Sequence, residues 1–474
     1  MRAAAPIAPR AQLLSRVRVA RPALGAEALR QGVALIALYT FVGLAFGLVL
    51  VVASRSTQLS PILEKGGSPR WLTWPFHEIA PEVRVHLWKV AGLFTSVVAG
   101  MGACYLVVLR LARSLPTRPT LAAIGLLHLI FLLSPPFLLT DIFNYINYAR
   151  LGVVHGLDPY THFAAQRPLD PTYHLATWHH LPTPYGPLYT LFTYALVPLG
   201  VHAGYWALKA FAMLTSLSCL WLVWRCAREL GKPPLPAVVL VWLNPLVVVY
   251  GLGGFHNDFF WLLPMLLAVW LVLRGRDVAS GALAAATPFV KLAAGASAPF
   301  LLLGARRRGA AIVAAAITGA VLLAGTFLAF GTHFPGYHDQ VSVVVGPYSV
   351  PTDIASLFGA TVGPGVRHVT SAVLVAVLVL LLVRTWRGAD WISSAGWAAA
   401  ALALAQFEPM PWYVLWSLPF AALGRSRALH GGVLVLSVVL FFHATPQQSL
   451  LLTHDLGIQG TPLDAGRATR ALLH

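Results

Sequence analysis

Long apolar runs separated by short polar stretches dominate the chain. An α-helix needs about 20 apolar residues to cross the hydrocarbon core of a membrane, and many runs here approach that length. We predict eleven crossings, at 32–54, 86–109, 120–140, 204–224, 235–253, 256–274, 309–330, 366–386, 390–407, 411–424 and 428–445. The predicted fold class is all-α, a polytopic membrane protein with one transmembrane domain at 32–445.

Two further apolar segments do not read as simple crossings. Residues 187–201 are short and aromatic, which predicts a helix lying in the outer interface. Residues 279–304 contain Pro288, Lys291 and Pro299. Proline breaks a helix, and a lysine at membrane depth needs a polar environment. We therefore expect 279–304 to form two half-helices, a re-entrant hairpin that enters and leaves on the cytoplasmic side.

The charge distribution tests this topology. Of 474 residues only 10% are charged, yet Lys and Arg outnumber Asp and Glu by 33 to 16. The cations cluster beside apolar runs, which is the positive-inside pattern of membrane proteins and argues against nucleic-acid binding. Eleven crossings place the basic segment 1–31 and the other clusters in the cytoplasm. The loops 55–85, 141–203 and 331–365 and the tail 446–474 then face outward.

Acidic residues are scarce, so the one that opens the largest outer loop is informative. Asp141 follows a long apolar run and can act as a general base at the membrane surface. Tyr145 would share its helix face, and Arg150 offers a fork-shaped donor suited to phosphate. The alternative is an acid at a helix end that simply faces water.

The same loop is rich in aromatic residues and prolines. Tyr160 and Tyr185 lie in Asp-Pro-Tyr and Pro-Tyr-Gly-Pro motifs, which would build rigid, flat walls for sugar rings. An interfacial aromatic belt is an equally good interpretation. His179 and His180 are adjacent and have no second ligand pair at useful spacing, so we predict no metal site.

Three other outward-facing or broken segments complete the candidate site. His256, Asn257 and Asp258 open a predicted helix, where backbone N–H groups favour anions or hydroxyls, although Asn and Asp are also ordinary caps. Lys291 would contact phosphate, with snorkelling to the interface as the alternative. Glu408, Trp412 and Tyr413 form another outer turn, where we expect substrate contacts.

The sequence contains no Walker loop, dinucleotide fingerprint, nucleophile elbow or zinc protease motif in a place where it could act. We predict no cofactor. Because nothing visible would house a nucleotide, the simplest activated donor is a lipid phosphate.

The ordered set of these motifs resembles the GT-C membrane glycosyltransferases. The similarity covers about 120–445 and is carried by 141–145, 150–151, 156–160, 184–188, 244–246 with 253–258, 291–292, and 411–413 with Trp416. Within that superfamily the chain is most similar to polyprenol-phosphate-mannose-dependent α-mannosyltransferases of actinobacterial type. The resemblance implies inverting transfer and a catalytic acid at Asp141. Many relatives pair two acids in this loop, whereas Ile142 follows Asp141 here.

The leading hypothesis is therefore a bacterial plasma-membrane glycosyltransferase with an outward-facing active site. It would move a hexose, mannose by resemblance, from a polyprenyl-phosphate donor in the lipid bilayer to a glycan or glycolipid acceptor. A transporter or lipid flippase is the first alternative, because broken helices with a buried lysine suit that class too. A glycan ligase or polymerase with a diphosphate-linked donor is the second.

Overall fold

The computed structural model describes residues 11–53, 70–79, 87–137, 141–332, 348–360 and 362–444. These residues form helices and turns without any strand, which confirms the all-α class. Among them, five helical stretches are long and apolar enough to cross a membrane: Gly25–Ala53, Gly92–Arg110, Pro187–Glu229, Arg308–Phe330 and Pro364–Trp386. The protein is thus a polytopic membrane protein, while eleven crossings stays a prediction. The tail 446–474, most of the loop 55–85 and part of the loop 331–365 lie outside the described residues.

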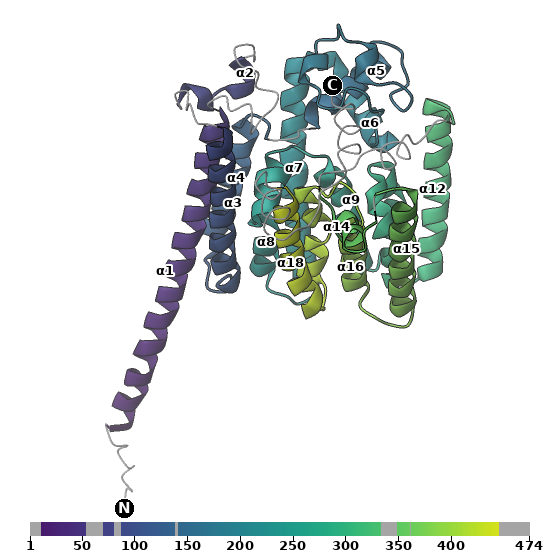
Figure 1. The fold of residues 1–474 in the computed structure, drawn as a ribbon. Coiled ribbons are helices and arrows are strands. Elements are labelled where there is room, and N and C mark those ends of the chain that lie inside the picture. The colour runs from purple at the N-terminus through teal and green to yellow at the C-terminus, as the bar shows by residue number, and fades with distance from the viewer. Residues whose placement is uncertain are drawn as a thin grey trace, which may run out of the picture.

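The first helices form a layer at one side of the molecule (Figure 1). Helix α1 (Ala11–Ala53) packs along α3 (Leu87–Arg110) and α4 (Thr117–Leu133), and the short α2 (Arg70–Thr73) and η1 (Phe76–Glu78) lie near their outer ends. Helix α1 begins at Ala11, ahead of the crossing predicted at 32–54, and its apolar stretch Gly25–Ala53 overlaps that crossing. Ala, Leu and Arg, which are strong helix formers, dominate this early part and need no apolar stripe to be helical.

Helical hairpins form the centre of the molecule. The first consists of α8 (Pro234–Trp242), the π-turn η5 (Val247–Leu252) and α9 (Asp258–Leu273). The second consists of α10 (Asp277–Ala286), η6 (Thr287–Phe289), η7 (Leu292–Ala296) and α11 (Ala298–Gly304). The third consists of α16 (Trp391–Leu404), η8 (Pro411–Trp416) and α17 (Leu418–Leu423). Prolines occur at each of the three breaks, where they interrupt helical hydrogen bonding.

In the second and third hairpins, a carboxylate at the start of the hairpin binds the backbone of arginine residues at its end. Asp277, at the start of α10, accepts hydrogen bonds from the backbone N–H groups of Arg306 and Arg307, just beyond α11. Asp390, before α16, accepts one from Arg425, just beyond α17. The segment predicted as a re-entrant hairpin therefore does return to the end where it starts. The crossing predicted at 411–424 is not one continuous helix, because it consists of a 3₁₀ turn followed by a six-residue helix.

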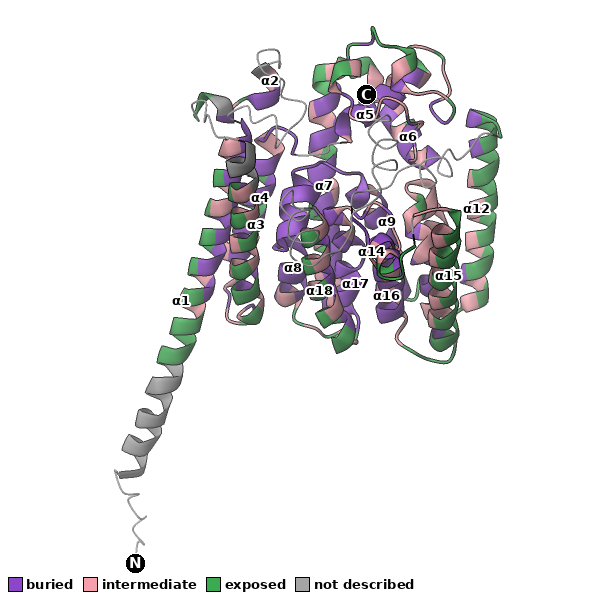
Figure 2. Cartoon of the chain, viewed as in Figure 1, coloured by how far each residue is buried: buried purple, intermediate pink, exposed green. Residues whose placement is uncertain are grey.

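Helices α12 (Arg308–Phe330) and α15 (Pro364–Trp386) stand at the periphery, and α18 (Arg427–Ala444) packs beside the third hairpin. Figure 2 shows that α12 and α15 are exposed over most of their length. Their exposed residues are apolar, for example Val321, Leu328 and Val379. An apolar surface of this extent is typical of contact with lipid. The short helix α14 (Val350–Leu357) precedes α15.

A compact cap covers the tips of the hairpins (Figure 1). It contains α5 (Ile142–Val153), η2 (Ala164–Gln166), η3 (Tyr173–Leu175), α6 (Pro187–Tyr194) and η4 (Val197–Leu199), and then continues into α7 (Gly200–Glu229). The interfacial helix expected at 187–201 is thus α6 followed by η4, and its depth in a membrane stays a prediction. Gly186 attaches the cap to the second hairpin, because its N–H donates to the carbonyl of Val290 at 3.0 Å.

Candidate active site

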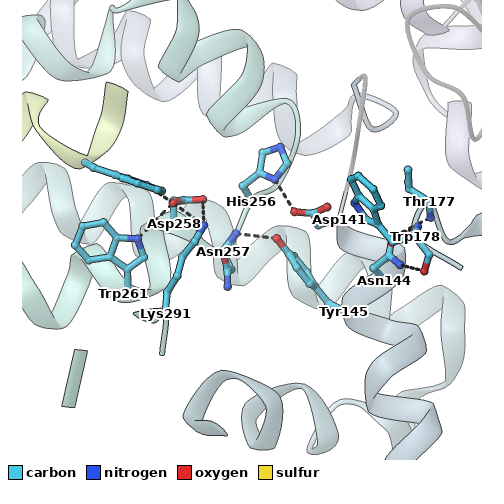
Figure 3. A network of polar contacts seen from close by, with 11 residues as sticks. Asp141, Asn144, Tyr145, Thr177, Trp178, His256, Asn257, Asp258, Trp261 and Lys291 are labelled. Carbon is cyan, nitrogen blue, oxygen red and sulfur yellow. Dashed lines mark hydrogen bonds and ion pairs between the residues drawn. The ribbon is translucent and has the colours of Figure 1, made fainter. Parts of the chain in front are cut away.

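Asp141 and His256 face each other across the boundary between cap and hairpins (Figure 3). Asp141 directly precedes α5, and its Oδ2 lies 3.3 Å from His256 Nδ1. One turn further along α5, the hydroxyl of Tyr145 accepts a hydrogen bond of 3.0 Å from the backbone N–H of Asn257. The first turn of α5 is therefore docked against the tip of the first hairpin through Asp141 and Tyr145.

The tip of the first hairpin has unusual backbone requirements. A Cβ on Gly254 would lie 2.4 Å from His256 Nε2, and one on Gly253 would lie 2.2 Å from the carbonyl oxygen of Val249. Phe255 has a φ of 54°, which is uncommon for a residue with a side chain. This tight turn presents the His256 ring, which stacks on Trp412 with ring centroids 3.4 Å apart.

A buried ion pair joins the first and second hairpins. Both carboxylate oxygens of Asp258 accept hydrogen bonds of 2.9 Å from Lys291 Nζ. The indole N–H groups of Trp261 and Trp416 also donate to Oδ1 of Asp258. The Asp258 side chain is 1% exposed, whereas Lys291 keeps 16%. Lys291 thus has its counter-ion on one side and open space on the other.

That open space is a cavity of about 390 Å³, which lies in the size range of small-ligand sites. Asp141 and Tyr185 contribute the cap side, Lys291 the second hairpin, and Glu408 the third. The remaining lining residues are Tyr148, Trp178, Leu181, Pro184, Leu292, Ala293, Thr370, Ser371, Leu374, Leu402, Ala405, Gln406, Phe407, Met410, Trp412, Tyr413 and Trp416. The lining of the cavity therefore combines two acidic residues and one basic residue with aromatic and aliphatic side chains.

The two carboxyl groups in the cavity differ in protonation. Burial alone raises the pKa of Asp141, but the hydrogen bond and charge of His256, helped by Tyr185 and Lys291, outweigh burial and hold this pKa below its usual value. Burial, together with the charge of Asp141, raises the pKa of Glu408 to about 8. At neutral pH, Asp141 is therefore an anion that can accept a proton, and Glu408 is mostly a neutral acid that can donate a hydrogen bond.

Most predicted site residues gather here. Six of them line the cavity, and Tyr145, His256, Asn257 and Asp258 lie directly behind it. Asn257 stands at the N-cap of α9 without a capping hydrogen bond from its side chain, so simple capping does not explain it. Trp412 has an indole N–H with no hydrogen-bond partner among the described residues.

Arg150 and Tyr160 lie away from the cavity. Arg150 donates through Nε to both oxygens of Asp170 at 3.0 Å, so its predicted phosphate contact has no support in this arrangement. Tyr160 donates to the backbone carbonyl of Tyr185 at 2.9 Å and so supports a cavity wall from behind. Both residues stabilise the cap. The spacing of sequence motifs does not show whether such a residue stabilises the fold or contacts a ligand.

The sequence analysis did not identify Lys209 or the residues of α15 that line the cavity, Thr370, Ser371 and Leu374. Lys209 is wholly buried and donates to the carbonyl of Ser134 at 2.6 Å. A lone lysine inside the predicted crossing 204–224 was a usable signal, because intramembrane charges are rarely without function. Thr370 and Ser371 gave no signal, since hydroxyl residues are common in membrane helices. Among the described residues, no group of three or more His, Cys, Asp and Glu side chains could hold a metal ion.

Comparisons with known proteins identify the family of the chain. Residues 40–307 match the family model "Alpha-(1->6)-mannopyranosyltransferase, N-terminal domain", and residues 357–458 match "MptB C-terminal domain". The chain is 30% identical over 354 residues to alpha-(1->6)-mannopyranosyltransferase A of Mycobacterium tuberculosis, which covers 65% of this chain and 67% of the relative. It is 24% identical over 370 residues to alpha-(1->6)-mannopyranosyltransferase B of Corynebacterium glutamicum, covering 67% and 60%. No solved structure matches the chain.

Proposed function

Because the chain belongs to the alpha-(1->6)-mannopyranosyltransferase family, we propose that it transfers mannose from a polyprenyl-phosphate donor to a glycan or glycolipid hydroxyl, at the extracytoplasmic face of the plasma membrane. One observation carries the proposal. An ionised carboxylate, Asp141, and an ammonium, Lys291, line the same cavity as Leu374, an apolar residue of the lipid-facing helix α15.

The donor class follows from this mixture of polar and apolar walls. A polyprenyl phosphate is an amphiphile whose phosphate needs a cation and whose chain needs an apolar exit. Lys291 supplies the cation, and Leu292 beside it is 43% exposed while it also lines the cavity. Leu374 of α15 continues the apolar lining. A nucleotide sugar would leave these apolar walls unused.

The proposed reaction is a single in-line displacement. Asp141 accepts the proton of the acceptor hydroxyl, and that oxygen attacks the anomeric carbon of the mannosyl group. The bond between the anomeric carbon and the phosphate oxygen breaks, and the electron pair leaves with the phosphate. One displacement inverts the anomeric centre, so an α-linked product requires a β-linked donor.

Several neighbours of the reacting groups support these steps. His256 and Tyr185 orient the Asp141 carboxylate, whose remaining lone pairs can accept the proton of the acceptor hydroxyl. Lys291 faces the charge that builds on the leaving phosphate, and a preorganised cation of this kind is usually a large catalytic contribution. Glu408, as a neutral acid, can donate a hydrogen bond to a sugar oxygen.

The outward orientation rests on the basic end of the fold. Arg306, Arg307 and Arg425 lie where the second and third hairpins return, at the ends opposite the cavity. The positive-inside rule assigns such an end to the cytoplasm. The cap and the cavity beneath it then belong to the other side of the membrane.

Three radiolabelled donors test the proposal with purified protein in liposomes. These are polyprenyl-phosphate mannose, a polyprenyl-diphosphate-linked mannose and GDP-mannose, each with a short oligomannoside acceptor. We expect a stable product carrying a new α-(1→6) linkage from the monophosphate donor alone. Product from the diphosphate donor would indicate a ligase, and product from GDP-mannose would contradict the lipid donor. Movement of the labelled lipid across the bilayer without product would indicate transport.

A further inference from the structure

A buried lysine outside the cavity contacts both the segment that leads to Asp141 and the segment that carries His256. Lys209 lies in α7 and is fully buried. Its ammonium donates to the carbonyl oxygen of Ser134 at 2.6 Å and lies 4.4–4.9 Å from the ring centroids of Tyr205, Trp206 and Phe255. Among the described residues, no carboxylate forms a salt bridge with it. Burying a lysine side chain without a carboxylate partner is costly and calls for a function.

The first contacted segment leads to Asp141. Ser134 is the residue that ends α4, and the chain runs from there to Asp141 at the start of α5. Its carbonyl would be an unsatisfied helix-end acceptor without Lys209. Phe137, in the same connection, donates its N–H to the carbonyl of Gly253 at 3.1 Å. The described part of the connection, 134–137, is thus held against both α7 and the tip of the first hairpin.

The second contacted segment carries His256. Phe255 immediately precedes His256 and has the φ of 54° noted above. A left-handed conformation is unfavourable for a residue with a side chain and persists only where its surroundings hold it. The ammonium over the Phe255 ring, 4.6 Å from its centroid, is one of the contacts that hold it.

We propose that Lys209 is a positioning residue, which sets the distance between Asp141 and His256 by binding the Ser134 carbonyl and the Phe255 ring at once. Lys209 does not line the cavity, so it acts through these two segments and not on the substrate. The inference rests on the proposed function, because its importance for rate presupposes that Asp141 is the base.

The test is Lys209→Met, which keeps the length of the side chain and removes the ammonium. We expect kcat to fall about 10–100-fold, since a shift of about 1 Å in a reacting group can cost that much, with KM for the donor within twofold of wild type. The acid limb of the pH–rate profile should also move to higher pH, because a weaker His256 contact no longer lowers the pKa of Asp141. The titratable groups facing Asp141 are His256, Tyr145, Tyr148, Tyr185, Tyr189, Lys291 and Glu408.

Lys232→Met is the matched control. Lys232 also donates to backbone carbonyls, those of Leu423 and Gly424, but at the basic end of the fold. It should leave kcat and the acid limb unchanged. If Lys209→Met behaves like this control, or lowers the rate without moving the acid limb, the positioning role is wrong.

Phe255→Leu keeps the test decisive if Lys209→Met does not fold. It removes the ring beneath the ammonium and should give the same acid-limb shift, and wild-type behaviour would overturn the proposal. Where both variants fold, their effects on kcat should combine less than multiplicatively, because they break one contact. Hydrogen exchange of the 253–258 turn should be faster in Lys209→Met. That readout stands even if the wild-type protein transfers no mannose, a result that would remove the proposed function instead.

Discussion

The pair Asp258–Lys291 allows a structural role to be separated from a catalytic one. Among the described residues, Lys291→Met would leave the Asp258 carboxylate, 1% exposed, with only indole donors. Removing one partner of a buried ion pair typically costs about 3–5 kcal/mol. Asp258→Asn should cost a similar amount by leaving the ammonium without its counter-ion. The double variant Asp258→Asn/Lys291→Met removes both charges and should recover most of the stability.

The order of the three variants by activity should differ from their order by stability. If Lys291 stabilises the leaving phosphate, the double variant stays at least about 10²-fold slower than wild type, the usual cost of losing one such donor. Thermal unfolding in detergent gives the stability order, and mannose transfer gives the activity order. A double variant that folds well and transfers mannose within a few fold of wild type would refute the role of Lys291 in the reaction.

The pair Arg150–Asp170 provides a control of equal burial. Its side chains are 16% and 1% exposed, as are those of Lys291 and Asp258. Because it lies away from the cavity, Arg150→Gln/Asp170→Asn should change the unfolding temperature while the specific activity of the folded protein stays near wild type. A large loss of specific activity in this control would show that the assay reports cap stability and not phosphate binding.

Three further predictions concern the cavity and its supports. The rate of mannose transfer by the wild type should decline as pH rises through about 8, because the neutral form of Glu408 is lost there. Glu408→Gln should remove that decline. If Glu408→Gln is inactive at every pH, the carboxyl group itself is needed. Gly186→Ala should destabilise the protein by about 1–3 kcal/mol, since its Cβ would lie 2.1 Å from the carbonyl oxygen of Phe289; in thermal unfolding, Gly125→Ala, with nothing within 4 Å, should not destabilise it. Trp412→Phe keeps a ring on His256 but removes the indole N–H, and should raise KM severalfold, by about the worth of one hydrogen bond; an unchanged KM would show that this N–H does not bind substrate.

Several parts of the fold could be predicted from the sequence for physical reasons. The long apolar helices follow directly from the thickness of the membrane. The break around Lys291 follows from proline and from the need to solvate a charge. Asp141 and Tyr145 were correctly placed on one face, because helical spacing is strict.

Other parts depend on tertiary contacts that spacing does not encode. The extension of α1 back to Ala11 and the division of 411–424 were not predicted, because hydropathy measures neither helix propensity nor a local change to 3₁₀ geometry. Arg150 looks like a phosphate ligand until Asp170, distant in sequence, is seen beside it. Lys209 was overlooked because its partners are a carbonyl and aromatic rings, which carry no charge pattern.

The most direct test of the central claim is the rate of mannose transfer by purified Asp141→Asn. This substitution keeps the shape of the side chain and removes its basicity. We predict a well-folded protein that binds the donor and transfers mannose roughly 10²–10⁴-fold more slowly than wild type, the usual contribution of a general base. Asp158→Asn, in the same cap but outside the cavity lining, should retain wild-type transfer. A folded Asp141→Asn protein with near-wild-type transfer would contradict the account.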